Sequence, residues 1–197
     1  MHDLGPAARE LSRITAHVGD GDLDRPTPCG DWRVRDLLGH LLAFATHFIG
    51  VARHEAPGAG GAPHELTDDW RAVLDDRLVE LAAAWSEPSA WEGAGSAGGL
   101  TMPTAELGVV ALEELVLHGW DLAQSVGTKI AVRDEDVAIV AGFVAQFEHA
   151  DQDARTGLYG PVVHTTSGTE LERVLALAGR DATLTADGGT STITSTR

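Results

Sequence analysis

The sequence has 197 residues and a formal net charge of −16, from 30 acidic and 14 basic side chains. This length suits one well-buried core rather than two, and the acidic excess disfavours nucleic acid or an anionic membrane as partners, because both select basic surfaces. Cys29 is the single cysteine, which excludes an intramolecular disulfide and is typical of a reducing compartment. The sequence has no apolar run of about 18 residues, and its first ten residues, MHDLGPAARE, contain no apolar h-region. We therefore expect a soluble, cytoplasmic protein that is a monomer or a homodimer and binds neither nucleic acid nor membrane.

Apolar residues at helical spacing predict four long helices and two shorter ones. Asp31 is placed to cap the second helix, and Gly127 is placed to end the fourth. A Gly/Pro-rich linker at 56–66 and an irregular glycine-rich loop at 88–100 separate the long helices. The predicted helices cover 4–18, 31–54, 67–85, 103–126, 134–150 and 169–178.

This order of elements predicts an all-α fold, a four-helix bundle with additional short helices and little or no sheet. Residues 1–181 would form one helical-bundle domain, and 182–197 would form a polar C-terminal tail. Within 182–196, threonine-rich strings flank Asp187 and two glycines, a pattern compatible with either a weak hairpin or a frayed terminus.

Residues 111–123, ALEELVLHGWDLA, have the apolar spacing of a buried helix but carry Glu114 and His118. Positions four apart share one face of a helix, whereas Glu113 is expected to point well away from that face. Burying a carboxylate or an imidazole without a partner is costly. The pair therefore has two readings: an exposed ion pair, which would contribute little to stability, or two ligands of a metal ion.

His40 lies within a second apolar stripe, on the helix predicted over 31–54. Two helices that project nitrogen and carboxylate ligands into the core of a bundle can build a metal site. His40, Glu114 and His118 would supply three protein ligands and leave a fourth position open, as catalytic metal sites do. The alternative for His40 is a core histidine satisfied by a local hydrogen bond.

Other residues near these stripes have weaker candidate roles. His47 would point inward about 10 Å from His40, too far to share an ion, so we expect it to line a cavity or cap a core hydrogen bond. Asp121 would either accept the N–H of a ligand imidazole or pair locally. Cys29 has no evident base beside it, which a catalytic cysteine needs, and is assigned a structural role. Two tryptophans are assigned to packing: Trp32 and Trp120.

Three motifs occur in order along the chain: Thr27-Pro-Cys-Gly-Asp-Trp-Arg-Val-Arg-Asp-Leu-Leu-Gly-His40-Leu, then Glu114-Leu-Val-Leu-His118-Gly-Trp-Asp-Leu-Ala123, then Arg155-Thr-Gly-Leu-Tyr-Gly-Pro with Leu175-Ala-Leu-Ala-Gly-Arg-Asp181. Together they resemble the mycothiol-dependent maleylpyruvate isomerase-like family, which belongs to the DinB-like superfamily of four-helix metalloproteins. The third motif resembles a shorter branch without an appended C-terminal domain. The resemblance implies a DinB-like bundle over 1–181 and metal ligands at His40, Glu114 and His118.

The resemblance also implies a divalent-metal-dependent enzyme, with zinc as the expected ion and nickel as the second choice. Such an enzyme activates a low-molecular-weight thiol, mycothiol, for attack on a small electrophilic substrate. The founding isomerase has a second, C-terminal domain that contributes to its activity, so a thiol transfer or conjugation is favoured here over isomerisation of maleylpyruvate. The alternative is a non-catalytic helical bundle that binds a small ligand or a metal. The sequence offers no candidate general acid or base.

Overall fold

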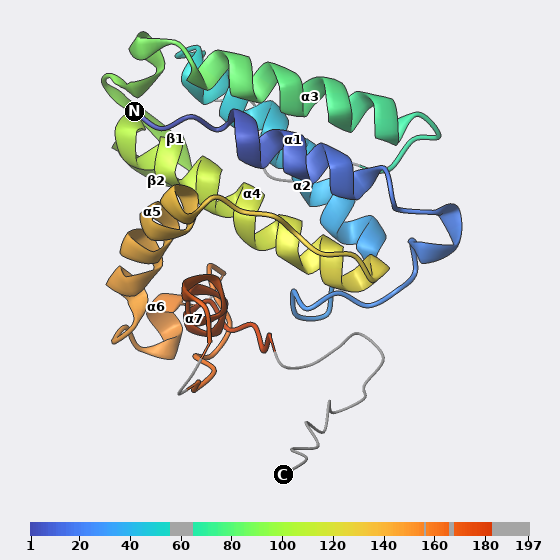
Figure 1. The fold of residues 1–197 in the computed structure, drawn as a ribbon. Helices are drawn as coiled ribbons and strands as arrows, with labels where there is room; N and C mark the ends of the chain where they lie inside the picture. The colour runs from blue at the N-terminus through green and yellow to red at the C-terminus, as the bar shows by residue number, and fades with distance from the viewer. Residues whose placement is uncertain (56–64, 156, 166–167, 183–197) are drawn as a thin grey trace.

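Helices α1 to α4 pack around a shared apolar core in this computed structural model (Figure 1). The structure describes residues 1–55, 65–155, 157–165 and 168–182. Helices α1 and α2 each contact both α3 and α4, so the four helices close into a bundle. The predicted all-α bundle is thereby confirmed. The bounds of the four helices are Gly5–Thr15 for α1, Val34–Ala52 for α2, Trp70–Trp85 for α3 and Thr104–Val126 for α4.

The start of α2 corrects the predicted cap at Asp31. The helix begins only after Arg33, whose backbone is extended. The Asp36 carboxylate accepts a hydrogen bond from the Arg33 backbone N–H, with an N···O distance of 2.9 Å, and so satisfies a donor that has no partner within the helix. Upstream, the Thr27 backbone N–H donates to the Trp32 carbonyl at 3.0 Å. This bond closes residues 27–32 into a tight loop, and Asp31 lies inside that loop rather than at the helix.

The region predicted as an irregular loop over 88–100 is partly regular. It contains a 3-10 turn, η2 Pro88–Trp91, and the start of a hairpin in which β1 Ala94–Ala97 pairs antiparallel with β2 Leu100–Pro103. Gly98 and Gly99 join the strands with φ values of 58° and 79°, and a two-residue type I′ turn needs positive φ at both positions. The Nε2 atom of His47 lies 2.8 Å from the Ser96 carbonyl oxygen and ties the hairpin to α2. Within the described residues this hairpin is the only sheet.

The chain after α4 forms a smaller helical layer against the bundle. Gly127, with φ of 72°, ends α4 in the left-handed conformation, as predicted. Helix α5, Asp134–Val144, contacts both α4 and α7, Glu170–Leu177, while the 3-10 turn η3, Ala145–Phe147, and α6, Gln152–Arg155, lie between them in sequence. Figure 1 shows this layer beside α4, on the side away from α3. Helix α4 is therefore covered on more than one side, and Glu114 is the one residue within 111–123 that is not buried.

Among the helices of the described residues, none combines the length and the apolar character needed to cross a membrane. Residues 56–64 of the predicted linker lie outside the described part of the chain. The threonine-rich segment also lies outside it from residue 183 onward. The division between a domain over 1–181 and a tail over 182–197 stays a prediction.

Candidate metal centre

Three side chains from two helices converge between α2 and α4. The Nε2 atom of His40, on α2, lies 2.8 Å from Oε2 of Glu114, on α4. The Nε2 atom of His118, one turn further along α4, lies 3.3 Å from the same carboxylate oxygen. One ligand atom from each of the three residues lies within 4.8 Å of the others. The structure thus brings together all three residues that the sequence predicts as ligands, and it forms a group that could hold a metal ion.

The triad lies at the boundary between the core and the solvent. The side chains of His40 and Glu114 are 28% and 23% exposed, whereas that of His118 is 10% exposed. Among the described residues, no arginine or lysine pairs with Glu114, so its charge is met only by the two imidazoles. Two imidazoles therefore approach the same oxygen of one carboxylate, at a point that solvent can reach. These donors suit a divalent cation of the zinc or nickel type.

Charge within the triad determines the protonation of its members. Burial would raise the pKa of Glu114, but the charges and hydrogen bonds of His118 and His40 outweigh burial and hold that pKa well below its ordinary value. Burial would likewise lower the pKa of His118, but the charge of Glu114 and the hydrogen bond to Asp121 raise it well above its ordinary value. Glu114 is therefore an ionised acceptor, and without a metal His118 holds a proton tightly.

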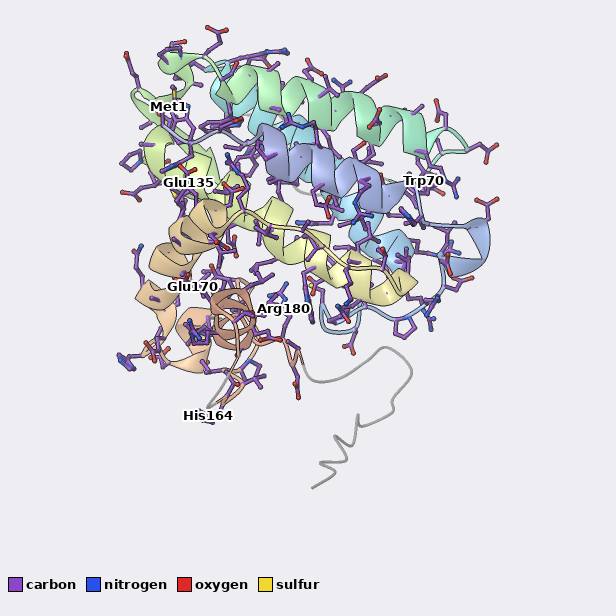
Figure 2. The ribbon with its side chains drawn as sticks, viewed as in Figure 1. Met1, Trp70, Glu135, His164, Glu170 and Arg180 are labelled. Atoms are coloured by element: carbon purple, nitrogen blue, oxygen red, sulfur yellow. The ribbon has the colours of Figure 1, made fainter. Side chains whose placement is uncertain are left out.

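Asp121 and Arg180 lie behind His118. Oδ2 of Asp121 lies 3.0 Å from Nδ1 of His118, so the carboxylate holds the ring nitrogen that points away from Glu114. The Arg180 guanidinium pairs with both Asp121 oxygens, Nη2 to Oδ2 at 2.9 Å and Nε to Oδ1 at 3.3 Å. Figure 2 shows Arg180 between α7 and α4. This contact is the one expected if Asp121 accepts the second N–H of a ligand histidine, and that His118 is a ligand stays a prediction.

Cys29 lies close to His118 and Asp121. The expectation that no potential base lies beside its thiol is therefore wrong. Its thiol, an imidazole nitrogen of His118 and an oxygen of Asp121 form another group of three potential ligands. However, Arg180 Nη2 lies 3.9 Å from the Cys29 sulfur and also pairs with Asp121. A guanidinium already neutralises these acceptors, so the second group is a poor place for a cation. The triad around Glu114 is the better metal site.

Glu113, which the spacing predicted to lie off the face of α4 that carries Glu114 and His118, is not exposed to solvent. Its side chain is buried, because the layer formed by α5 to α7 covers the side of α4 that a simple bundle would leave in solvent. Tyr159, from this layer, hydrogen-bonds to Glu113. Burial, together with the neighbouring charge of Glu114, raises the pKa of Glu113 to about 8. In the folded protein at neutral pH, Glu113 is therefore mainly a protonated, buried carboxyl group.

The remaining candidates have clear positions. His47 makes the bond to the hairpin described above and is not a member of either ligand group. Trp120 is buried in the core, as predicted. Trp32 does more than fill space, because its ring lies 5.0 Å from the ring of His40 and 6.0 Å from that of His118, measured between centroids.

Two residues of the site were missed by reasoning from spacing. Arg180 and Tyr159 both lie in the third sequence motif, which carried no assigned role. Both come from the segment after α6, far from α4 in sequence. A lone buried arginine 59 residues from its carboxylate partner leaves no periodic pattern, so only the motif itself pointed to this segment.

Comparisons with known proteins agree with this architecture. Residues 4–123 match the family model described as the mycothiol maleylpyruvate isomerase N-terminal domain. Two solved structures are similar: a crystal structure of the mycothiol-dependent maleylpyruvate isomerase and one of a histidine-to-alanine mutant of it. Each has 17% sequence identity to this chain and a TM-score of 0.67. Each superposition covers 94% of this chain and 88% of the chain in the solved structure. At this identity the likeness shows a shared fold, and it extends beyond residue 123. A search of curated proteins gives no significant match.

Proposed function

Because the chain belongs to the mycothiol maleylpyruvate isomerase N-terminal domain family, we propose that it is a divalent-metal-dependent enzyme acting on a low-molecular-weight thiol. The thiol, with mycothiol as the first candidate, would be transferred to a small electrophilic substrate or would promote its isomerisation. The observation that carries this proposal is the convergence of His40 and His118 on one oxygen of Glu114. A packed helical core has no structural need for two imidazoles and a carboxylate at a solvent-accessible point.

His40, Glu114 and His118 would hold the ion, with zinc expected and nickel as the second choice. When bound, the cation would supply Lewis acidity and favour the thiolate form of a thiol, which is the nucleophilic form. Three protein ligands leave room for such a co-substrate, as in catalytic rather than structural zinc sites. The partial exposure of His40 and Glu114 supports access by a small molecule.

The chain's own residues prepare the site for this chemistry. Asp121 accepts a hydrogen bond from Nδ1 of His118, which leaves the lone pair of the neutral ring on Nε2, the atom that faces Glu114. Asp121 stays ionised despite its burial, because the hydrogen bond with His118 and then the charge and hydrogen bonds of Arg180 hold its pKa below its ordinary value. The carboxylate can then hold this tautomer of His118 without itself becoming a proton donor.

The first experiment measures bound metal in the wild-type protein and in His118→Ala, Glu114→Gln and His47→Ala. The wild type should bind about one divalent ion per chain, and the first two variants should lose it while keeping their helical circular dichroism. His47→Ala is the matched control, because it removes a histidine two turns from His40 that lies outside the triad. Equal metal content in wild type and His118→Ala would contradict the assignment.

The second experiment tests catalysis. The metal-loaded protein is incubated with mycothiol and a panel of small electrophiles, and loss of free thiol is followed. The proposal expects turnover that His118→Ala abolishes and His47→Ala retains. Stoichiometric metal binding without turnover of any thiol would favour the alternative, a non-catalytic metal-binding bundle.

A further inference from the structure

The indole of Trp32 lies against both histidines of the triad. Its ring is 5.0 Å from that of His40, at an interplanar angle of 50°, and 6.0 Å from that of His118, at 25°, so the indole stacks on His118. The two imidazoles are themselves 4.8 Å apart and nearly perpendicular, at 75°. The three rings therefore form one cluster, and moving the indole changes the surroundings of two of the three proposed ligands at once.

The backbone of Trp32 is held firmly enough to act as a support. Its carbonyl accepts hydrogen bonds from both the backbone N–H and the hydroxyl of Thr27, at 3.0 and 2.9 Å. Its N–H donates to the Cys29 carbonyl at 3.2 Å, and the Cys29 N–H donates to the Thr27 hydroxyl at 3.2 Å. Gly30, with φ of 59°, allows the reversal of the chain within this loop. The loop thus presents the indole at a fixed position beside the start of α2.

The two histidines differ in what fixes their rings. Nδ1 of His118 is held by Asp121. For His40, the described residues provide a partner for Nε2, which is Glu114, and none for Nδ1. Ligand histidines usually have their second nitrogen fixed by a hydrogen bond, which sets the ring orientation. Within the described residues, His40 has no such hydrogen bond at Nδ1, and the indole of Trp32 contacts its ring instead.

We propose that Trp32 is a positioning residue of the metal centre, whose indole face holds the imidazoles of His40 and His118 at the mutual angle in which both meet Glu114. This inference rests on the proposed metal site. Offset and tilted contacts between aromatic rings are favourable and directional, so they restrict ring rotation in a way that an aliphatic side chain cannot. The role assigned to Trp32 by the sequence, general packing, predicts no such dependence on a flat ring.

The test compares Trp32→Phe with Trp32→Leu, since both keep an apolar side chain but only phenylalanine keeps a flat ring. Each metal-free protein is titrated with Co²⁺, and the affinity and the visible absorption spectrum of the bound ion are recorded. Trp32→Leu should bind Co²⁺ about 10–100-fold more weakly, the range found when the support of a ligand is removed, with an altered spectrum. Trp32→Phe should retain the wild-type spectrum and most of the affinity.

Trp91→Phe is the control for tryptophan replacement as such, because Trp91 packs against Trp85 and His2 rather than the triad. It should leave both the Co²⁺ affinity and the spectrum unchanged. A wild-type spectrum and affinity in Trp32→Leu would overturn the inference while leaving the metal site intact. Equal losses in the Phe and Leu variants would overturn it as well, because the flat ring would then not be what matters. If the wild type binds no Co²⁺, the metal site itself fails.

Discussion

Arg180 and Asp121 form a two-point ion pair inside the protein, with Nη2 and Nε of the guanidinium at 2.9 and 3.3 Å from the two carboxylate oxygens. The side chains are 7% and 0% exposed. The same carboxylate holds the imidazole of His118. The segment after α7 is thereby connected to α4, which carries two of the three proposed ligands, through one charged group.

Arg180→Met should strongly destabilise the protein, because it removes the guanidinium that pairs with both oxygens of the buried Asp121 carboxylate and leaves only His118 beside it. Removing one partner of a buried ion pair costs about 3–5 kcal/mol. Urea unfolding of the metal-free protein measures the effect. Arg173→Met is the matched control, since Arg173 is an exposed arginine on α7, and it should change the free energy of unfolding little. Comparable decreases in the free energy of unfolding of the two variants would show that the buried ion pair contributes no more than an exposed arginine.

Asp121→Asn should weaken metal binding by about 10–100-fold, the usual effect of changing the group that orients a ligand histidine. The asparagine side chain carries no charge to fix the tautomer of His118. Asp136→Asn is a matched control, because Asp136 is also buried and paired with an arginine, Arg133 at 2.7 Å. Isothermal titration with Zn²⁺ should show a loss only for Asp121→Asn. A similar loss in both would attribute it to general destabilisation.

Glu113→Gln should change how stability depends on pH. The pKa of Glu113 rises from an ordinary 4.5 to about 8 in the folded protein, so between these values the folded state keeps a proton that the unfolded chain has released. The contribution of Glu113 to stability is complete below its unfolded-state pKa of 4.5. It is lost as the pH rises to its folded-state pKa of about 8, by up to about 1.4 kcal/mol per pH unit.

Glutamine does not titrate, so the difference in melting temperature between Glu113→Gln and the wild type should shift in favour of the variant as pH rises through this window. Thermal melts of metal-free protein by circular dichroism provide the measurement. Glu106→Gln, which alters an exposed carboxyl on the same helix, should show no such trend. A difference that stays constant with pH would mean that Glu113 ionises normally inside the fold.

Two glycines of α4 should respond differently to alanine. A Cβ at Gly108 would lie 2.4 and 2.5 Å from ring carbons of Trp91 and 2.9 Å from one of Trp85. A Cβ at Gly119 would meet the terminal methyl group of Ile130 at 2.9 Å, and that flexible end can move aside.

Alanine favours the helix equally at both positions, so the difference between the variants isolates packing. Gly108→Ala should lower the free energy of unfolding by about 1–3 kcal/mol, the usual cost of overpacking, and Gly119→Ala should be close to neutral. Chemical denaturation of both variants measures this. The reverse order of stability would contradict the packing described around Trp91.

The long helices could be predicted from the sequence because they follow from local periodicity. Periodicity left the role of the triad open, and the resemblance to a known family pointed to it. Apolar spacing locates the long helices, and four-residue spacing puts Glu114 and His118 on one face. The start of α2 was misplaced because hydrogen bonds around Thr27, rather than helix propensity, decide where it begins. Such loop closure depends on contacts that no periodic pattern records.

The burial of Glu113 could not be predicted for a different physical reason. Spacing tells which residues share a face of α4, but not how many faces are covered. The layer of α5 to α7 buries the side where Glu113 lies, and Tyr159 supplies its hydrogen bond. The contacts of Trp32 with His118 and of Arg180 with Asp121 were missed because each joins segments distant in sequence.

The separation of Asp121 and Arg180 by 59 residues also fixes an order of assembly. During synthesis the N-terminal part of a chain emerges and begins to fold first, so α1 to α4 can associate before Arg180 leaves the ribosome. Until then the carboxylate of Asp121 has no guanidinium beside it, and one side of α4 is open to water. The bundle at that stage lacks its buried ion pair, and the segment after α7 later supplies the guanidinium.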